Sequence, residues 1–215
     1  MSQWNIYLLI PNLIGYARIF FILLAFFFCF EQHYLFLLFY SISQLLDVLD
    51  GYAARYFRQA TKYGAVLDMV TDRASTAALL IAMTKVYPQY ARVFMALIAL
   101  DIVSHFAHVA SALIQGKQSH KLIGRGQHWL LRLYYTHKAV LFTLCFGNEA
   151  FLLFLYLLHL KPSFELLPQL RTIILPLLTY ALGALFVLKQ FVNVIQLIKA
   201  GQDLVRFDKK ERKGA

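Results

Sequence analysis

The sequence predicts an all-α integral membrane protein with six transmembrane helices and a short interfacial helix at the N-terminus. Of its 215 residues, 60% are apolar and 15% are charged, whereas soluble domains average about 45–50% apolar and about 25% charged residues. This composition excludes a disordered chain and argues against a soluble globular enzyme. Apolar stretches near the length of about 20 residues that a helix needs to cross a bilayer lie at 13–30, 34–54, 68–87, 92–114, 138–159 and 173–199.

The segment before the first apolar stretch has the composition of a membrane-interface helix. Trp4 and Tyr7 carry rings that suit the headgroup region, and Pro11 is tolerated in the first turn of the helix that follows. We therefore expect a single domain that begins with an interfacial segment and ends in a charged, solvated tail. Its expected parts are the whole domain, 1–215, the interfacial segment, 1–12, the six-helix membrane domain, 13–199, and the basic tail, 200–215.

The positive charge of the chain predicts its orientation in the membrane. The net charge is +10, from 21 Lys and Arg against 11 Asp and Glu. In a soluble protein this excess would suggest a nucleic-acid partner, but in a membrane protein positive loops that face anionic cytoplasmic lipid explain it more simply. With six spans, one side of the membrane receives twelve Lys and Arg and the other receives four. We therefore expect no nucleic-acid partner and place both termini in the cytoplasm.

Four aspartates lie in or beside the second and third apolar stretches, where an unpaired charge costs about 2.5–3.5 kcal/mol at mid-helix. Asp47 and Asp50 are three residues apart, and Asp68 and Asp72 are four apart, so each pair lies on one face of its helix. A short connection joins the two helices at the cytoplasmic end, and an antiparallel hairpin then brings the four carboxylates together. Bare carboxylates at this spacing would repel one another strongly.

Two divalent cations would balance the four negative charges. Hard oxygen ligands favour Mg²⁺ or Mn²⁺, and two-metal sites typically promote displacement at phosphorus. The residues around the acids suit a phosphate ligand, because small residues allow close approach of a ligand and an arginine can grip a pyrophosphate with two hydrogen bonds. These residues are Gly51, Ala54 and Gly64 (small), Arg55 (phosphate grip) and Thr61 (hydroxyl donor).

Two segments separated by eight residues carry a recognisable motif, Asp47-Val-Leu-Asp50-Gly51-Tyr-Ala-Ala54-Arg55 and Gly64-Ala-Val-Leu-Asp68-Met-Val-Thr-Asp72. They resemble the signature of the CDP-alcohol phosphotransferase family, DxxDGxxAR followed by GxxxDxxxD, at all eight defining positions. Other segments resemble the eukaryotic phosphatidylinositol synthases within that family. These segments are 11–18, 67–73, 119–121, 132–136 and 142–145.

The resemblance implies the family fold and a reaction in the endoplasmic reticulum membrane. CDP-diacylglycerol and myo-inositol would give phosphatidylinositol and CMP, in a protein that forms a homodimer as family members do. The resemblance assigns Asp47, Asp50, Asp68 and Asp72 to two metal ions, Mg²⁺ or Mn²⁺, and Asp72 also to the general base. It assigns the CDP-diacylglycerol contacts to Asn12, Gly51, Ala54, Arg55, Thr61 and Gly64, with Arg18 as a less specific nucleotide-side contact.

The inositol pocket should be polar and close to Asp72. Asp101, His105 and His108 share one face of the fourth apolar stretch, although a buried partner for a neighbouring span explains Asp101 equally well and core histidines explain the other two. The candidate inositol contacts are His105, Ser119, Lys121 and Arg132.

Other interpretations remain open at this point. The aspartates could form a structural ion-pair cluster with Arg55 and Arg73. The same chemistry could serve another acceptor, namely glycerol phosphate, serine, choline or ethanolamine. A transporter with carboxylates at the membrane midplane and a non-catalytic scaffold are the alternatives from other classes.

Overall fold

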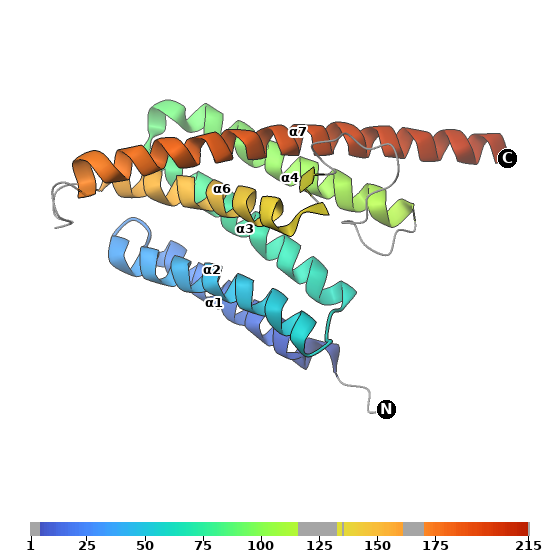
Figure 1. The fold of residues 1–215 in the computed structure, drawn as a ribbon, viewed down its shortest axis with the longest axis horizontal. Helices are drawn as coiled ribbons and strands as arrows, with labels where there is room; N and C mark the ends of the chain where they lie inside the picture. The colour runs from blue at the N-terminus through green and yellow to red at the C-terminus, as the bar shows by residue number, and fades with distance from the viewer. Residues whose placement is uncertain (1–4, 116–132, 135, 161–169, 215) are drawn as a thin grey trace. The chain divides into compact units, whose positions relative to one another are not determined.

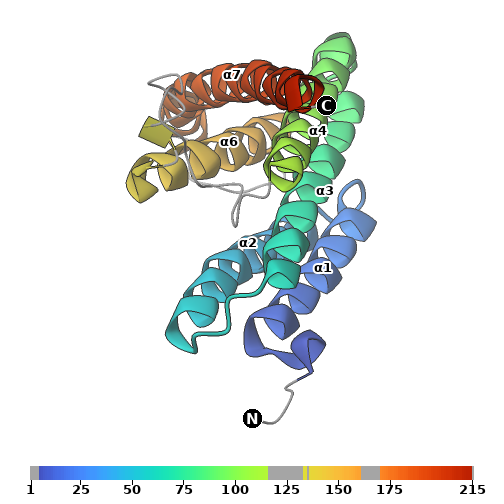
Figure 2. The same ribbon diagram turned by 90° about the vertical axis from the view of Figure 1, so that its right-hand side faces the viewer.

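The computed structural model describes residues 5–115, 133–134, 136–160 and 170–214, and these residues form helices and no strand (Figures 1 and 2). The predicted all-α class is therefore confirmed. The long helices are α1 (Ile10–Phe28), α2 (His33–Tyr56), α3 (Lys62–Val86), α4 (Ala91–Ile114), α6 (Lys138–His159) and α7 (Leu175–Gly214). Shorter turns are η1 (Ile6–Leu8) and η2 (Pro88–Tyr90), both 3-10 helices, and η3 (Leu170–Ile174), a π-helix.

The chain divides into two compact units, Met1–Ala82 and Met83–Ala215. The N-terminal unit holds α1, α2 and most of α3, and the C-terminal unit holds α4, α6 and α7. All eight positions of the family signature fall in the N-terminal unit. The organisation as one domain stays a prediction.

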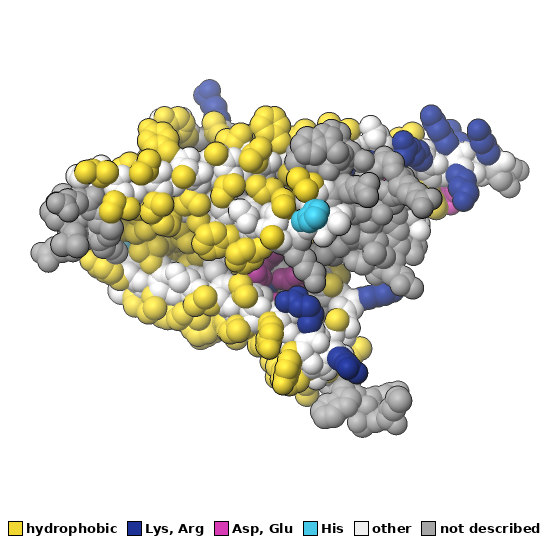
Figure 3. Space-filling view, in the orientation of Figure 1, with side chains coloured by type: hydrophobic (Ala, Val, Ile, Leu, Met, Phe, Trp, Pro, Cys, Tyr) yellow, Lys and Arg dark blue, Asp and Glu magenta, His cyan; other side chains and the backbone are white. Residues whose placement is uncertain are grey.

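Among the described residues, five helices are long and apolar enough to cross a membrane. They are Ile10–Phe28, His33–Tyr56, Pro88–Ile114, Ala139–His159 and Thr172–Lys213. The chain is thus a multi-pass membrane protein, and Figure 3 shows hydrophobic side chains over the visible face of α7 and of the N-terminal helices. The expected third span corresponds to α3, which has 25 residues. Asp68, Asp72, Arg73 and Lys85 make α3 too polar for the apolar set, so the count of six spans stays a prediction.

In the N-terminal unit, α1 and α2 pack along stripes that recur every three or four residues, as on one helix face. The stripe of α1 is Pro11, Asn12, Gly15, Arg18, Ile22 and Ala25, and that of α2 is Phe36, Tyr40, Ser43, Asp50 and Ala53. One half of this interface is aromatic, with the rings of Phe26 and Tyr40 edge to face at 6.0 Å. The other half is polar, which confines the buried charges to one end of the helix pair.

In the C-terminal unit, α7 packs against α4 and α6, and polar side chains lie buried along this contact. Asn193 on α7 donates from Nδ2 to Asp101 Oδ1 on α4 at 3.2 Å, and Lys189 donates to Asn193 Oδ1 at 2.6 Å. Gln196 donates to the carbonyl oxygen of Ser104 at 3.3 Å. Polar groups inside a membrane need partners within the protein, and here α4 and α7 supply them to each other. Asp101 is therefore a buried partner of a neighbouring span.

The two ends of the described chain are helical. From residue 5 onward, the 3-10 turn η1 precedes α1, and the Asn5 side chain accepts the N–H of Tyr7 at 3.1 Å in this turn. Trp4 lies outside the described residues, so the interfacial helix stays a prediction. At the other end α7 continues to Gly214, because the segment is rich in good helix formers and Lys199 pairs with Asp203 one turn on at 2.8 Å.

Candidate active site

The connection between α2 and α3 sets how the two acidic faces meet. After α2 ends, Arg58 adopts a left-handed backbone with φ of 54°, and the N–H of Gln59 donates back to the carbonyl of Ala54 at 2.9 Å. This pattern closes a helix C-terminus, usually with glycine at the left-handed position. Gln59 Oε1 then accepts the N–H of Ile10 at 3.1 Å, and Thr61 Oγ1 accepts the N–H of Gly64 at 3.0 Å. These bonds tie the connection to the start of α1 and cap the start of α3.

The structure brings the four aspartates of α2 and α3 together. Carboxylate oxygens of Asp47, Asp50 and Asp68 lie within 4.8 Å of one another, and Asp72 joins them through a shared ion pair. The Asp50 side chain is only 11% exposed, whereas those of Asp47, Asp68 and Asp72 are 36%, 39% and 36% exposed. Asp50 is thus a buried anchor of the cluster, and the other three carboxylates remain open to a ligand or reactant.

A single arginine of α1 contacts all four carboxylates. Arg18 is 1% exposed, and its guanidinium lies 2.6 Å from Asp47, 2.9 Å from Asp50, 2.9 Å from Asp68 and 2.7 Å from Asp72. An arginine inside an apolar stretch normally requires carboxylate partners, and this signal in the sequence could have indicated Arg18 as the partner of the aspartates. Its expected nucleotide-side contact stays a prediction.

The alternative counter-ions have looser contacts with the cluster. Arg73 approaches Asp72 Oδ2 at 3.8 Å. Arg55 is exposed, and its Nη1 lies 3.4 Å from the position that a Cβ on Gly51 would occupy. Arg18 therefore holds the central position that the ion-pair interpretation had given to Arg55 and Arg73.

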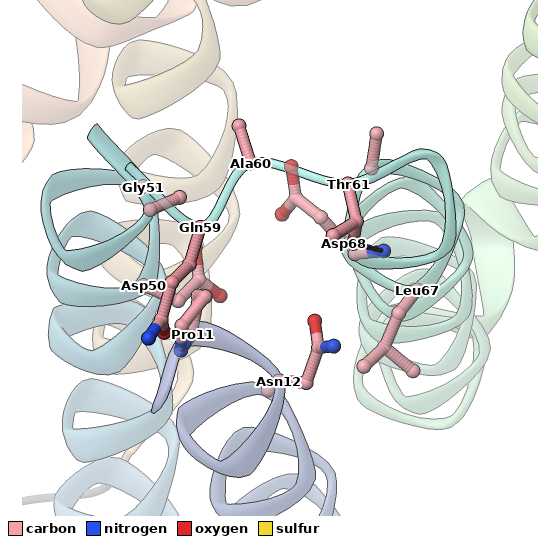
Figure 4. A pocket seen from close by; sticks show the side chains of 13 residues that line it. Pro11, Asn12, Asp50, Gly51, Gln59, Ala60, Thr61, Leu67 and Asp68 are labelled. Carbon is pink, nitrogen blue, oxygen red and sulfur yellow. Dashed lines mark hydrogen bonds between the residues drawn. The ribbon is translucent and has the colours of Figure 1, made fainter. Parts of the chain in front are cut away.

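Beside the acids, a cavity opens between α1, α2 and α3 within the N-terminal unit (Figure 4). Its lining includes most of the expected nucleotide contacts: Asn12, Gly51, Ala54, Thr61 and Gly64. The two acids nearest to it, Asp50 and Asp68, also line it. Sequence reasoning missed Pro11, Gly15 and Gln59, and Gln59 stands in a connection where no helical spacing could reveal it.

Two of the expected small residues that line the cavity, Gly51 and Gly64, have different surroundings. A Cβ on Gly64 would lie 2.8 Å from Asn12 Oδ1 and 3.2 Å from Thr61 Oγ1. Asn12 is buried and donates from Nδ2 to the carbonyl of Ile6 at 2.5 Å, so it is not free to swing aside. A Cβ on Gly51 would meet only the flexible end of Arg55. Gly64 is needed for close packing of α3 against α1, and Gly51 leaves room in the cavity.

We expect Gly64→Ala and Gly51→Ala to differ in stability. Overpacking against Asn12 should make Gly64→Ala destabilising by about 1–3 kcal/mol. Gly51→Ala should be neutral or stabilising by up to about 1 kcal/mol, because alanine is the better residue within a helix. Thermal unfolding of the two variants in the same detergent measures the difference, and equal melting temperatures would contradict it.

The expected inositol contacts are only partly described. His105 lies on α4 in the C-terminal unit, where its Nδ1 is 2.8 Å from the backbone oxygen of Asp101. Ser119, Lys121 and Arg132 lie outside the described residues. This contact of His105 is therefore with the backbone of its own helix, one turn earlier.

The donor set of the cluster suits a hard divalent cation. All of its ligand atoms are carboxylate oxygens, three of them close enough to share one ion, and Mg²⁺ and Mn²⁺ prefer such ligands. The negative charge of four aspartates also exceeds the single positive charge of Arg18. The residues present thus fit a metal centre.

Comparisons with known proteins identify the class of protein. The sequence model of the CDP-alcohol phosphatidyltransferase family matches residues 8–188, and this chain belongs to that family.

Relatives that carry one common name match almost the whole chain. A CDP-diacylglycerol–inositol 3-phosphatidyltransferase of Schizosaccharomyces pombe is 40% identical, over 98% of this chain and 94% of that protein. Proteins of the same name are 39% identical in Homo sapiens, over 99% and 98% of the two chains, and 43% identical in Saccharomyces cerevisiae, over 94% and 88%. No solved structure matches the chain.

Proposed function

We propose that this chain transfers the phosphatidyl group of CDP-diacylglycerol to a hydroxyl of myo-inositol and releases CMP. The observation that carries the proposal is the set of four aspartates on α2 and α3 around one buried arginine, Arg18, next to a cavity lined by small residues. The names of the relatives with about 40% identity over nearly the full length support the choice of inositol. A transporter or scaffold would not require this arrangement.

Asp72 is the proposed general base of the reaction. The family resemblance gives this role to Asp72. Its carboxylate is 36% exposed, as accessible as those of Asp47 and Asp68, and a base must reach the proton that it removes. Asp72 takes the proton of the inositol hydroxyl, and the hydroxyl oxygen attacks the phosphorus that bears diacylglycerol. The bond from this phosphorus to the oxygen of CMP breaks, and CMP leaves with the electron pair. One displacement completes the reaction, and no enzyme nucleophile is required.

The proposed nucleotide site is the cavity in the N-terminal unit. Asn12, Gly51, Ala54, Thr61 and Gly64 line it, and the exposed guanidinium of Arg55 stands over Gly51, where it can grip phosphate oxygens. We assign CDP-diacylglycerol binding to these six residues. For myo-inositol, His105, Ser119, Lys121 and Arg132 stay predicted contacts.

The proposed cofactors are two divalent ions, Mg²⁺ or Mn²⁺, held by Asp47, Asp50, Asp68 and Asp72. When bound, such ions supply positive charge that stabilises the negative charge developing on phosphate oxygens and on CMP. The carboxylate oxygens within 4.8 Å of one another support this assignment.

The proposed location is the endoplasmic reticulum membrane, with both termini and the site on the cytoplasmic side. The excess of Lys and Arg on one side of the predicted spans supports this orientation. A homodimer stays a prediction from the family resemblance, which light scattering of the detergent-solubilised protein would test.

Release of CMP by purified protein in detergent tests the proposed reaction. CDP-diacylglycerol and Mg²⁺ or Mn²⁺ are supplied with inositol, glycerol phosphate, serine, choline or ethanolamine in parallel. We expect CMP release with inositol alone. Release with another acceptor would contradict the inositol assignment and keep the chemistry, and no release from folded protein with any acceptor would contradict the enzyme itself.

A further inference from the structure

The guanidinium of Arg18 connects α2 to α3 twice. Nη1 donates to Asp50 Oδ2 on α2 and to Asp68 Oδ1 on α3, both at 2.9 Å. Nη2 donates to Asp72 Oδ1 on α3 at 2.7 Å and lies 2.6 Å from Asp47 Oδ1 on α2. Each terminal nitrogen thus bridges one carboxylate of each helix. This double bridge fixes the separation of the two acidic faces.

The position of Arg18 is itself fixed by packing. The side chain is 1% exposed, and Ser43 Oγ donates to the backbone oxygen of Arg18 at 3.1 Å, which anchors α1 to α2 at this residue. Among the described residues, Arg18 Nε has no hydrogen-bond partner. A buried guanidinium keeps its charge in proteins, and here its two terminal nitrogens make all of the compensating contacts.

Arg18 and a divalent cation would use the same carboxylates. Oxygens of Asp47, Asp50 and Asp68 lie close enough to share an ion, and Arg18 contacts all three of these side chains. One positive charge at this distance repels a cation. We propose that Arg18 is a positioning residue that holds the four carboxylates together and, through its positive charge, weakens their affinity for divalent cations. This inference rests on the proposed metal site and not on the identity of the acceptor.

Two quantities that do not involve turnover test the role of Arg18. One is the dissociation constant of Mn²⁺, measured by electron paramagnetic resonance of free and bound ion. The other is the melting temperature in detergent, in chelator and in saturating Mn²⁺. Arg18→Met removes the positive charge and keeps a side chain of similar length. Arg18→Lys keeps the charge but loses the two terminal guanidinium nitrogens. Arg73→Met is the matched control. Arg73 Nη2 lies 3.8 Å from Asp72 Oδ2.

For Arg18→Met we expect the melting temperature in chelator to fall by about 5 °C or more, because four carboxylates lose their common positively charged partner. We expect Mn²⁺ to bind about tenfold more tightly, the effect of removing a unit charge from beside the site. Saturating Mn²⁺ should therefore raise the melting temperature more in this variant than in the unmodified protein. Arg18→Lys should lie between the two, and Arg73→Met should change the Mn²⁺ constant by less than about threefold, because its 3.8 Å ion pair with Asp72 is longer than any contact of Arg18 with the cluster.

A lower melting temperature in chelator together with tighter Mn²⁺ binding separates this role from a general packing role. A residue needed only for packing would lower the melting temperature with and without Mn²⁺ and would weaken Mn²⁺ binding on replacement. That result, or an unchanged Mn²⁺ constant in both Arg18 variants, would overturn the inference and leave the proposed function intact. If Arg18→Met does not fold, the Mn²⁺ constant of Arg18→Lys decides in the same way. Failure of the unmodified protein to bind Mn²⁺ would overturn both the inference and the proposed metal site.

Discussion

Replacement of Asp72 by asparagine is expected to lower kcat by about a thousandfold or more, in the range found for the loss of a general acid or base. Asparagine has nearly the same shape, and its amide oxygen can still accept the hydrogen bond that Arg18 Nη2 donates to Asp72 Oδ1 at 2.7 Å. The cluster should therefore keep its form while the ability to take a proton is lost. Binding of CDP-diacylglycerol should be largely retained, since Asp72 does not line the cavity.

Turnover and binding must both be measured to interpret this variant. CMP release under saturating inositol gives kcat, and equilibrium binding of labelled CDP-diacylglycerol gives the affinity. Asp208→Asn, the same change on the exposed end of α7, is the matched control and should behave as the unmodified protein. Unchanged turnover in Asp72→Asn would contradict the role of base, and loss of nucleotide binding would leave Asp72 with a purely metal-binding or structural role.

Removal of divalent cations by a chelator is expected to abolish CMP release, with Mg²⁺ or Mn²⁺ restoring it. Four carboxylates surround one arginine, and the remaining negative charge would repel the phosphates of CDP-diacylglycerol unless cations neutralise it. The chelator is removed by gel filtration, and each metal is then added back to the same preparation. This order distinguishes loss of the ion from irreversible unfolding. Activity that persists in chelator would contradict the metal assignment.

The sequence predicted the helices well where their composition was simple. The stretches expected at 92–114 and 138–159 correspond to α4 at Ala91–Ile114 and α6 at Lys138–His159. The apolar stretch expected at 173–199 corresponds to the first part of α7, because hydropathy marks the end of the apolar segment and not the end of the helix. α7 continues through charged residues that favour helix as strongly as apolar ones do.

For the site, helical spacing could predict which aspartates share a face but not what lies between the faces. That information depends on α1, the helix that packs beside α2 and buries Arg18 and Asn12 on one face. The sequence also could not show that Gly51 and Gly64 have different surroundings, because the motif has glycine at both positions. Only the packing of Asn12 against Gly64 shows that one glycine serves helix contact and the other leaves space.

The length of α7 has a consequence for the electrostatics of the membrane surface. Its 40 residues extend about 60 Å at 1.5 Å per residue, about twice the hydrocarbon thickness of about 30 Å. The apolar part ends near Ile198, and about 16 Å of helix separate it from Lys209. The headgroup layer takes up about 5–8 Å of this distance, which leaves about one screening length of about 8 Å at physiological salt. When the helix stands upright, screening therefore weakens the attraction between anionic headgroups and the last basic side chains, visible at the end of α7 in Figure 3. Basic residues nearer to the spans then contribute more of the attraction to anionic lipid.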